Sequence, residues 1–459
     1  MFVGRARELQ KLEEMYAGGH FEFAVVYGRR RVGKTTLITK FCEDKRTIFF
    51  PSLESNAQAN LAAFSRAFYR LISPGATDAP VYGSFTQIFE QVGAMARSQR
   101  LVLAIDEYPW LALADESVSS ALQICIDHIF KNTKLFLILC GSSMSFMENQ
   151  VLGHKSPLYG RRTAQFRIAP LTYRESACFH PARPLTERAL IYGMTGGVPS
   201  YVERFDADSP LEDEIVSRFF DPNSYLFEEP ANLLKQELRE PRTYNAIIAA
   251  VAGGASRLNE IATKTGVEGG VCAQYLSTLA ELGIVKKERP VAEKSARKTL
   301  YSIEDLMFRF WYRFIPANLA MIQAGRGRAA YEQAVRPHLQ AYMGAVFERM
   351  CREFILNYYE PLPFSVSEIG RWWGTDPAKR EQAEIDIVAL AGDGARAIFC
   401  ECKYSDNPIG RSVAELLIER SKLLGGVREA FYILFSKSGF SMTAAGFSNL
   451  ALLRLDEMY

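Results

Sequence analysis

Two stretches of the chain combine residue types and spacings that suit phosphate chemistry, and the more specific one occupies residues 28–35. It reads G-x-x-x-x-G-K-T between a run of β-branched residues and a helix-like pattern. Its glycines let consecutive backbone amides wrap around a phosphate, and a helix beginning at Lys34 would add its positive end. Lys34, also a catalytic candidate, is expected to reach the β- and γ-phosphates of ATP, and the Thr35 hydroxyl is expected to bind Mg²⁺. The residues expected to contact the nucleotide here are Gly28, Arg29, Arg30, Arg31, Val32, Gly33, Lys34, Thr35 and Thr36.

An acidic pair after a second apolar run is expected to complete a nucleotide-hydrolysing site. Asp106 and Glu107 follow the run LVLAI. Asp106 would hold the Mg²⁺ shell, and Glu107 would polarise the attacking water. A glutamate directly after the aspartate favours a hydrolysing protein over a kinase, which would take the proton from an acceptor group instead. A strand that ends in an acidic turn is the alternative for this pair alone, and the upstream glycine-rich loop argues against it.

Three further polar residues are candidates for sensing or stabilising the phosphates. Ser142 follows the apolar run LFLILCG, where it would either sense the γ-phosphate or cap the next helix. Arg161 and Arg162 lie in SPLYGRRT and could supply an arginine finger, in cis or on a neighbouring subunit of a homo-oligomer. A solvated arginine pair without a catalytic role is the alternative. Both alternatives stay open at this stage.

The second stretch, EIDIVALAGDGARAIFCECKY, reads as a β-hairpin that carries charges among apolar residues. With a two-residue turn at residues 392–393, Asp386 would face Phe399 on the partner strand. Facing residues share one side of a sheet, and so do residues two apart on one strand. Asp386, Glu401 and Lys403 would then lie on the same side. A turn one residue longer would move Asp386 to the opposite side.

This hairpin suggests a metal site built from carboxylates. Asp386 and Glu401 would bind Mg²⁺ or Mn²⁺, because hard cations take oxygen ligands. Lys403 would orient a water or stabilise charge on a phosphate. Glu348, on a preceding helix-like stretch and off its apolar stripe, is a third candidate ligand. A structural hairpin with surface ion pairs is the alternative.

These side chains need elements that hold them in place, and the composition allows several domains. The 459 residues are 48% hydrophobic, enough for two to four domains with their own cores. Because no signal peptide is recognised and no apolar run reaches the length of a membrane span, we expect a cytoplasmic protein without membrane contact. The formal net charge of +2 is uneven, with +5 over residues 236–330 and −3 over residues 331–459. The two segments are therefore expected to have different partners.

The basic segment reads as a winged helix. TYNAIIAAVAGG, RLNEIATKTGV and VCAQYLSTLAELG give three helical stripes, and two strand-like pieces follow around a charged turn. That turn could neutralise nucleic-acid phosphates, but the third helix offers no arginine or lysine to read bases. DNA backbone contact and a purely packing role both stay open. The basic residues of the turn and its strands are Lys286, Lys287, Arg289, Lys294, Arg297 and Lys298.

The order of these motifs resembles the archaeal-type ATPase family, a P-loop family of the AAA+/STAND assemblage. FVGRARELQKL, GRRRVGKTT, AIDEYPWL, LCGSSMSFM, SPLYGRRT and GGVPSYVERF carry the likeness over the first half of the chain. RWWG and ECKY resemble a companion domain of this ATPase, which is itself similar to PD-(D/E)xK restriction-type nucleases. The resemblance implies a multidomain α/β protein with a parallel-sheet P-loop ATPase core at 1–170, a helical lid at 171–235, a winged helix at 236–320 and a C-terminal α/β restriction-endonuclease-like domain at 331–459.

The leading functional hypothesis is an ATP-binding and ATP-hydrolysing switch coupled to an effector directed at nucleic acid. ATP binding would order the lid and the winged helix, and hydrolysis would reset them. The effector is expected to be a Mg²⁺-dependent phosphodiesterase, although the sequence leaves cleavage itself open. One alternative is a regulatory or scaffold ATPase whose C-terminal domain binds a partner protein and no longer cleaves. Another is an ATP-dependent regulator that binds DNA.

Overall fold

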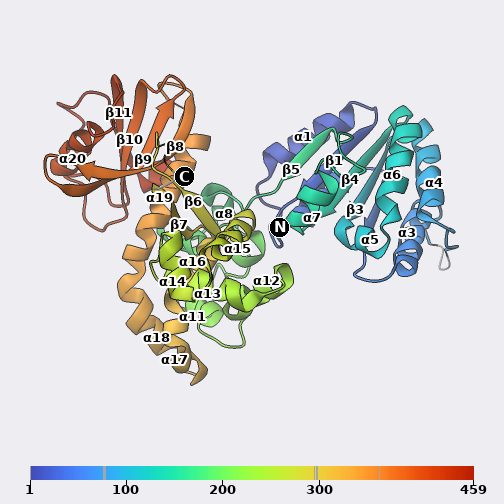
Figure 1. Ribbon diagram of the computed structural model, residues 1–459, viewed down its shortest axis with the longest axis horizontal. Coiled ribbons are helices and arrows are strands. Elements are labelled where there is room, and N and C mark those ends of the chain that lie inside the picture. The colour runs from blue at the N-terminus through green and yellow to red at the C-terminus, as the bar shows by residue number, and fades with distance from the viewer. Residues whose placement is uncertain (1, 76–78, 294, 296–297, 361) are drawn as a thin grey trace. The chain divides into compact units, whose positions relative to one another are not determined.

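The computed structural model describes residues 2–75, 79–293, 295, 298–360 and 362–459. The chain divides into two units (Figure 1). The N-terminal unit comprises Met1–Leu171 and Val198–Ser200, and the C-terminal unit comprises Thr172–Gly197 and Tyr201–Tyr459.

The N-terminal unit is built on a five-stranded parallel sheet, as the sequence predicts. Its strands lie in the order β2-β3-β4-β1-β5, and neighbouring strands are parallel. Because β4 lies between β1 and β3, the carboxyl ends of these three strands meet at one edge of the sheet. The strands are β1 (Glu22–Tyr27), β2 (Thr47–Pro51), β3 (Leu101–Asp106), β4 (Leu135–Gly141) and β5 (Ala164–Arg167).

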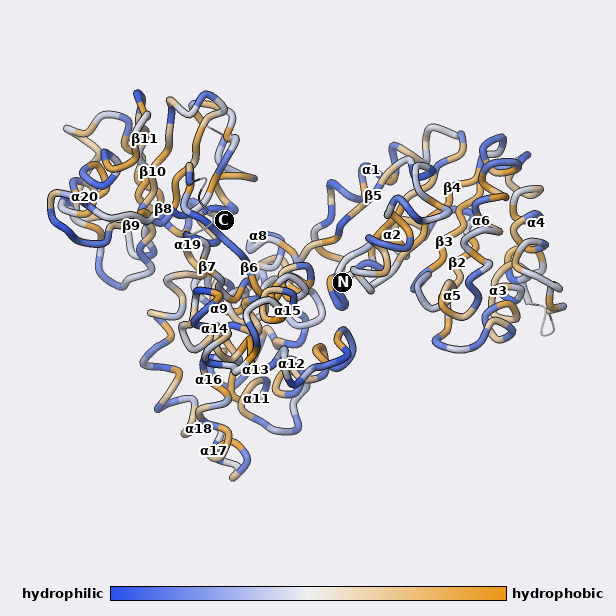
Figure 2. The backbone as a smooth tube through the Cα atoms, viewed as in Figure 1, coloured by the Kyte–Doolittle hydropathy of each residue, from blue (hydrophilic) through white to orange (hydrophobic). Residues whose placement is uncertain are grey.

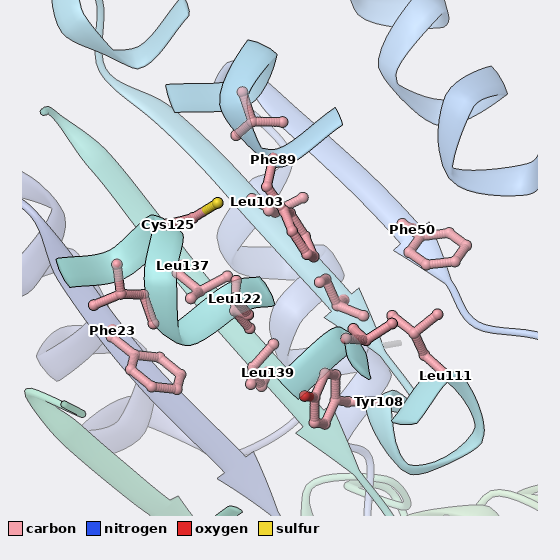
Figure 3. Close-up of a cluster of buried hydrophobic side chains, with 14 of the residues drawn as sticks. Phe23, Phe50, Phe89, Leu103, Tyr108, Leu111, Leu122, Cys125, Leu137 and Leu139 are labelled. Atoms are coloured by element: carbon pink, nitrogen blue, oxygen red, sulfur yellow. The ribbon is translucent and has the colours of Figure 1, made fainter. Parts of the chain in front are cut away.

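Helices cover both faces of this sheet, so β1, β3 and β4 are buried along their whole length. Such strands read as continuous apolar runs rather than as alternating ones, and Figure 2 shows them in the hydrophobic colour. One face packs against α1 and α2, and the other packs against α3 to α6 in the cluster of Figure 3. The helices are α1 (Ala6–Ala17), α2 (Lys34–Cys42), α3 (Ala57–Ile72), α4 (Phe85–Ser98), α5 (Tyr108–Ala114), α6 (Ser117–His128) and α7 (Met144–Phe146).

The first helices of the C-terminal unit surround the Gly-Gly-Val-Pro stretch in the sequence, of which Val198 and Pro199 belong to the N-terminal unit. α9 ends where Gly196 takes a left-handed conformation (φ +66°), and α10 begins at Pro199. This stretch is therefore a helix stop followed by a restart. The helices of this part are α8 (Tyr173–Ala177), α9 (Leu185–Thr195), α10 (Pro199–Val202, shared with the other unit), α11 (Leu211–Phe219) and α12 (Tyr225–Glu237).

Three short helices and a hairpin follow, in the order expected of a winged helix. Lys286 of the hairpin forms an ion pair with Glu288, and Lys298 forms one with Glu293 at 2.8 Å. Neighbouring glutamates thus offset two of the lysines expected to neutralise phosphates. Two other basic residues of that prediction, Lys294 and Arg297, lie outside the described residues. The elements are α13 (Pro241–Ala252), α14 (Leu258–Thr265), α15 (Gly269–Glu281), β6 (Val285–Glu288) and β7 (Leu300–Ile303).

The last part of the unit contains a five-stranded mixed sheet in the order β12-β11-β10-β9-β8. β8, β9 and β10 are antiparallel neighbours, whereas β10, β11 and β12 run parallel. α19 contacts β8, β9 and β10, and α20 packs into a hydrophobic cluster with the sheet. The elements from the hairpin onward are α16 (Leu306–Phe314), α17 (Leu319–Gln323), α18 (Gly327–Ala330), α19 (Leu339–Asn357), β8 (Val366–Asp376), β9 (Glu381–Ala391), β10 (Arg396–Lys403), α20 (Arg411–Ser421), β11 (Glu429–Ser436) and β12 (Leu450–Arg454).

The register predicted for the β9–β10 hairpin is wrong by two residues. Phe399 faces Val388 rather than Asp386, because four residues, 392–395, connect the strands instead of two. The side chain of Asp393 accepts a hydrogen bond from the amide of Ala395 (2.9 Å), and Gly394 takes φ +67°. These two features stabilise the turn of the longer loop.

A β-bulge also interrupts the alternation of side chains along β9. Between the pairs Trp372–Ile385 and Gly370–Val388, two residues of β9 oppose the single residue Arg371 of β8. Asp386 is one of those two residues. A bulge of this kind turns a side chain away from its regular direction, so simple alternation does not determine where Asp386 points.

No helix in the described part of the chain is both long enough and apolar enough to cross a membrane.

Candidate functional site

The loop between β1 and α2 has the geometry of a phosphate-binding loop. A Cβ atom at Gly28 would lie 2.3 Å from the carbonyl oxygen of Ile168, so only glycine fits there. Gly33 takes a left-handed conformation (φ +87°), and α2 begins directly after it at Lys34, as predicted. The nine predicted nucleotide contacts occupy this loop and the first turn of α2. Their backbone amides can therefore surround a phosphate at the positive end of the helix.

Lys34, Thr35 and Asp106 converge beside this loop. The hydroxyl of Thr35 donates a hydrogen bond to Oδ2 of Asp106 at 2.7 Å. The ammonium of Lys34 donates to the carbonyl oxygen of Arg29 at 3.0 Å, which holds its charge over the loop. Both Lys34 and Asp106 are buried. A hydroxyl and a carboxylate oxygen are suitable ligands for Mg²⁺, so the residues present fit the cation that the sequence predicts here.

Glu107 and Ser142 lie at the ends of the neighbouring strands β3 and β4. Oε2 of Glu107 accepts a hydrogen bond from the amide of Ser142 at 3.2 Å, and Oε1 accepts one from its hydroxyl at 2.5 Å. Glu107 has a left-handed backbone conformation (φ +49°), a form of strain typical of functional positions. The helix cap after β4 is Ser143, without a side-chain hydrogen bond. Ser142 is therefore not the ordinary helix cap considered as the alternative.

The two candidate finger arginines have different environments. Arg161 is held by Asp127, with both carboxylate oxygens 3.1 Å from its Nε and Oδ2 2.6 Å from one terminal nitrogen. This bond, with a second one from Lys131, lowers the pKa of Asp127 to about 2. Arg161 thus has a structural partner. Arg162 directly precedes Thr163, whose amide donates a hydrogen bond to the carbonyl oxygen of Phe23 near the start of β1. Burial raises the pKa of Tyr27, and the charge of Arg162 partly offsets this effect.

The C-terminal carboxylates lie on β9, β10 and α19 of the other unit. Oδ2 of Asp386 accepts a hydrogen bond from the amide of Cys402 at 2.8 Å. Oε1 of Glu401 lies 2.5 Å from the ammonium of Lys403. Glu348 on α19 forms an ion pair with Arg371 at 3.8 Å. Burial, followed by the charges of Glu401 and Glu348, raises the pKa of Asp386 well above its ordinary value.

These carboxylates do not form a ready metal site. Nowhere in the described residues do three or more His, Cys, Asp or Glu side chains gather in a way that could hold a metal ion. Glu401 is engaged by Lys403, and Glu348 is engaged by Arg371. The set Glu348, Asp386 and Glu401 therefore does not fit a metal as the side chains stand, and its role as ligands remains a prediction.

Comparison with known proteins adds two matches to family models. Residues 2–205 match an ATPase domain found predominantly in Archaea. Residues 311–415 match a family of archaeal and bacterial proteins of unknown function. The first match contains the residues of the candidate nucleotide site, and the second contains Glu348, Asp386, Glu401 and Lys403.

A curated relative extends the likeness over the whole length. The uncharacterized protein MJECL04 of Methanocaldococcus jannaschii is 33% identical over 444 residues, which cover 95% of this chain and 96% of that protein. The chain belongs to this archaeal P-loop ATPase family. The uncharacterized ATP-binding protein MJ0423 of the same organism is 50% identical over 46 residues, which cover 10% of this chain and 78% of that protein.

A solved structure shares the fold of this archaeal ATPase. The Walker-type ATPase PABY2304 of Pyrococcus abyssi superposes with a TM-score of 0.50 at 18% identity, covering 68% of this chain and 96% of that protein. At this identity the likeness shows the fold alone.

Arg5 contacts the candidate phosphate-binding loop, although the sequence did not single it out as a site residue. Its guanidinium donates hydrogen bonds to the carbonyl oxygens of Val32 in the phosphate-binding loop (2.9 Å) and of Ala169 (2.5 Å). Arg5 is buried and precedes α1 in a left-handed conformation (φ +64°). Its position after Gly4 is a turn signal, but no spacing rule connects residue 5 to residue 32. Only the fold brings them together.

Proposed function

We propose that this chain is an ATP-hydrolysing switch whose C-terminal unit acts on nucleic acid. The observation that carries the first part is the convergence of Lys34, Thr35, Asp106, Glu107 and Ser142 at one edge of the parallel sheet. In this proposal, Lys34 and the loop amides bind the phosphates of ATP, and Thr35 and Asp106 hold Mg²⁺. Bound Mg²⁺ supplies positive charge that offsets the β- and γ-phosphates.

Glu107 is the proposed general base. It would accept the proton of the attacking water, and the two hydrogen bonds from Ser142 would fix the direction of its carboxylate. A glutamine at this position keeps the shape of the side chain but cannot take the proton. We therefore expect Glu107→Gln to bind ATP normally and to lower turnover by about 10²- to 10⁴-fold. Phosphate release and nucleotide titration measure the two quantities. Turnover at the wild-type rate would remove Glu107 from this role.

The C-terminal unit is proposed to cleave nucleic acid. The support for this proposal is the concentration of Asp386, Glu348, Glu401 and Lys403 around the β9–β10 hairpin, together with the sequence resemblance to restriction-type nucleases. Incubation with labelled DNA and RNA, with ATP and Mg²⁺ or Mn²⁺, tests cleavage. We expect nicking to be lost in Asp386→Asn and kept in Asp393→Asn, which changes an exposed aspartate in the hairpin loop.

The second candidate function is a regulatory or scaffold ATPase without cleavage. The observation in its favour is that Lys403 and Arg371 engage two of the three carboxylates as ion pairs. Intact DNA and RNA after exhaustive incubation would favour this candidate. A partner protein captured only with ATP, and captured equally well by Asp386→Asn and Glu401→Gln, would establish it in place of the nuclease.

A further inference from the structure

A cavity of about 410 Å³ opens within the C-terminal unit, where the β6–β7 hairpin, α16, α19 and the strands β8 and β9 come together. Its wall carries three acidic residues, Glu304, Glu348 and Asp386, and twice as many basic ones. The cavity is therefore positively charged in spite of its carboxylates. The basic residues are Lys286, Arg309, Arg313, Arg349, Arg352 and Arg371.

Half of these basic side chains have carboxylate partners. Arg349 forms ion pairs with Glu304 at 3.2 Å and with Glu353 at 3.3 Å. Arg371 forms three ion pairs, the shortest with Glu384 at 3.0 Å. Lys286 forms the ion pair with Glu288. These three residues are explained by contacts within the protein.

The other half, Arg309, Arg313 and Arg352, form no ion pair and no side-chain hydrogen bond with any residue that the structure describes. Arg309 lies 5.8 Å from the ring centre of Tyr342, and Arg313 lies 5.6 Å from that of Phe314. Arg309 and Arg313 are four residues apart on α16, so they project from the same side of the helix. Three guanidinium groups thus line one cavity without a direct ion-pair partner among the described residues, although the charge of Arg309 also acts on Glu348.

This arrangement costs free energy unless an anion completes it. Like charges that share a cavity repel each other, and the partly enclosed space weakens solvent screening. A guanidinium binds phosphate oxygens through two parallel hydrogen bonds, which makes arginine the usual partner for phosphate. The hydroxyl oxygen of Ser302, in the same cavity wall, is buried without a hydrogen-bond partner among the described residues. It can donate to a phosphate oxygen as well.

We propose that this cavity binds the phosphates of a nucleic-acid strand, with Arg309, Arg313, Arg352 and the hydroxyl of Ser302 as the contacting groups. The proposal deepens the proposed function and rests on it, because it assigns the phosphate-binding part of the nucleic-acid effector. A strand is favoured over a free nucleotide because Arg313 is exposed, which continues the basic lining to the surface. Tyr301 also lines the cavity and offers a ring on which a base can stack.

The position of Asp386 and Glu348 in the wall gives this assignment a consequence. A phosphate held by the arginines would lie in the same cavity as two of the three carboxylates that the sequence connects with cleavage. The strand would thus be bound where the effector chemistry is predicted. Strand binding and cleavage can nevertheless be tested by separate substitutions, because the arginines are on α16 and α19 and Asp386 is on β9.

Fluorescence anisotropy with a labelled single-stranded 20-mer, as DNA and as RNA, tests the assignment on the full chain. We expect Arg309→Gln/Arg352→Gln to weaken binding at least 10-fold. The slope of log affinity against log salt concentration should also fall by the equivalent of about two phosphate contacts. The control is Arg326→Gln/Arg428→Gln, which removes the same charge from exposed arginines outside the cavity. It should change affinity less than 2-fold.

ATP turnover and thermal melting show that the double variant is folded, and Arg309→Lys/Arg352→Lys, which keeps the charge, should bind with intermediate affinity. Wild-type affinity in Arg309→Gln/Arg352→Gln would overturn the cavity assignment and leave the nucleic-acid effector standing. Failure of the wild type to bind either strand at low salt would instead remove the effector itself. Competition by AMP or inorganic phosphate as effective as competition by the strand would assign the cavity to a free phosphorylated ligand and overturn the strand proposal.

Discussion

The carboxylate of Glu107 accepts hydrogen bonds from both the amide and the hydroxyl of Ser142. The two residues follow neighbouring parallel strands, β3 and β4, so the sheet order itself brings them together. This contact connects the proposed general base directly to the proposed sensor of the γ-phosphate. A phosphate oxygen that draws the Ser142 hydroxyl toward itself would change the direction in which Glu107 points.

Ser142→Ala is expected to lower ATP turnover by about 10- to 100-fold, because a hydrogen bond to a charged group is worth about 1.5–3 kcal/mol. ATP affinity should change little, since Lys34 and the loop amides are untouched. Steady-state phosphate release and nucleotide titration measure the two effects. Ser143→Ala is the matched control, because its side chain makes no capping hydrogen bond. An equal loss of turnover in both variants would argue against the Ser142–Glu107 contact as the cause.

Arg161 and Arg162 should respond differently to alanine substitution. Arg161→Ala removes the partner of Asp127 and is expected to lower thermal stability while turnover persists. Arg162→Ala, if this residue supplies the finger, should lower turnover by about 10³-fold without a change in melting temperature. Parallel melting curves and phosphate-release assays separate the two. Normal turnover in both variants would show that neither arginine acts as a finger.

The bond between Asp127 and Arg161 should give a defined pH dependence of stability. Hydrogen bonds from Arg161 and then Lys131 lower the pKa of Asp127 to about 2 in the folded state. A lowered folded-state pKa stabilises the fold above the unfolded value near 4, and this contribution is lost as the pH falls toward 2. The difference in unfolding free energy between wild type and Asp127→Asn should therefore be about 1–2 kcal/mol at pH 6. Denaturant melts should show that this difference in unfolding free energy shrinks below pH 4. A difference that grows on acidification would contradict the stabilising bond between Asp127 and Arg161.

Arg5→Ala is expected to destabilise the N-terminal unit by about 2–3 kcal/mol and to weaken ATP binding. The substitution leaves the carbonyl oxygens of Val32 and Ala169 without their charged donor. Because Val32 belongs to the phosphate-binding loop, the loss should reach the nucleotide as well as the fold. Denaturant melts and nucleotide titration measure both. Arg7→Ala, at an exposed position of α1, should leave stability and ATP affinity unchanged. If Arg5→Ala also left both quantities unchanged, the proposed support of the phosphate-binding loop by Arg5 would be wrong.

Local sequence was sufficient to predict that the residues of the candidate nucleotide site come together, because they are adjacent in the chain or follow strands directly. Gly33 and Lys34 mark the start of α2, and Asp106 ends an apolar run that becomes β3. A parallel sheet collects the carboxyl ends of its strands at one edge, so these residues could be brought together from the pattern alone. Arg5 could not be predicted in this way, because its hydrogen-bond partners lie 27 and 164 residues away in the sequence.

The C-terminal hairpin shows where prediction from local pattern fails. The glycines on both sides of Asp393 allow several turns, and the capping bond from Ala395 selects a loop two residues longer than expected. The bulge opposite Arg371 then removes the alternation on which the predicted direction of Asp386 depended. The bulge depends on pairing with the partner strand β8, which local sequence does not reveal. The arginine-lined cavity could not be predicted either, because it combines residues from three helices and four strands.

The most direct test of the account is ATP binding and turnover by Lys34→Ala beside Lys40→Ala. Both lysines lie on α2, but Lys34 is buried over the phosphate-binding loop, whereas Lys40 is exposed and pairs with Glu43. We expect Mg²⁺-dependent ATP hydrolysis by the wild type, no measurable turnover and greatly weakened binding in Lys34→Ala, and wild-type behaviour in Lys40→Ala. Equal turnover in wild type and Lys34→Ala would show that the loop at residues 28–35 is not the hydrolytic site.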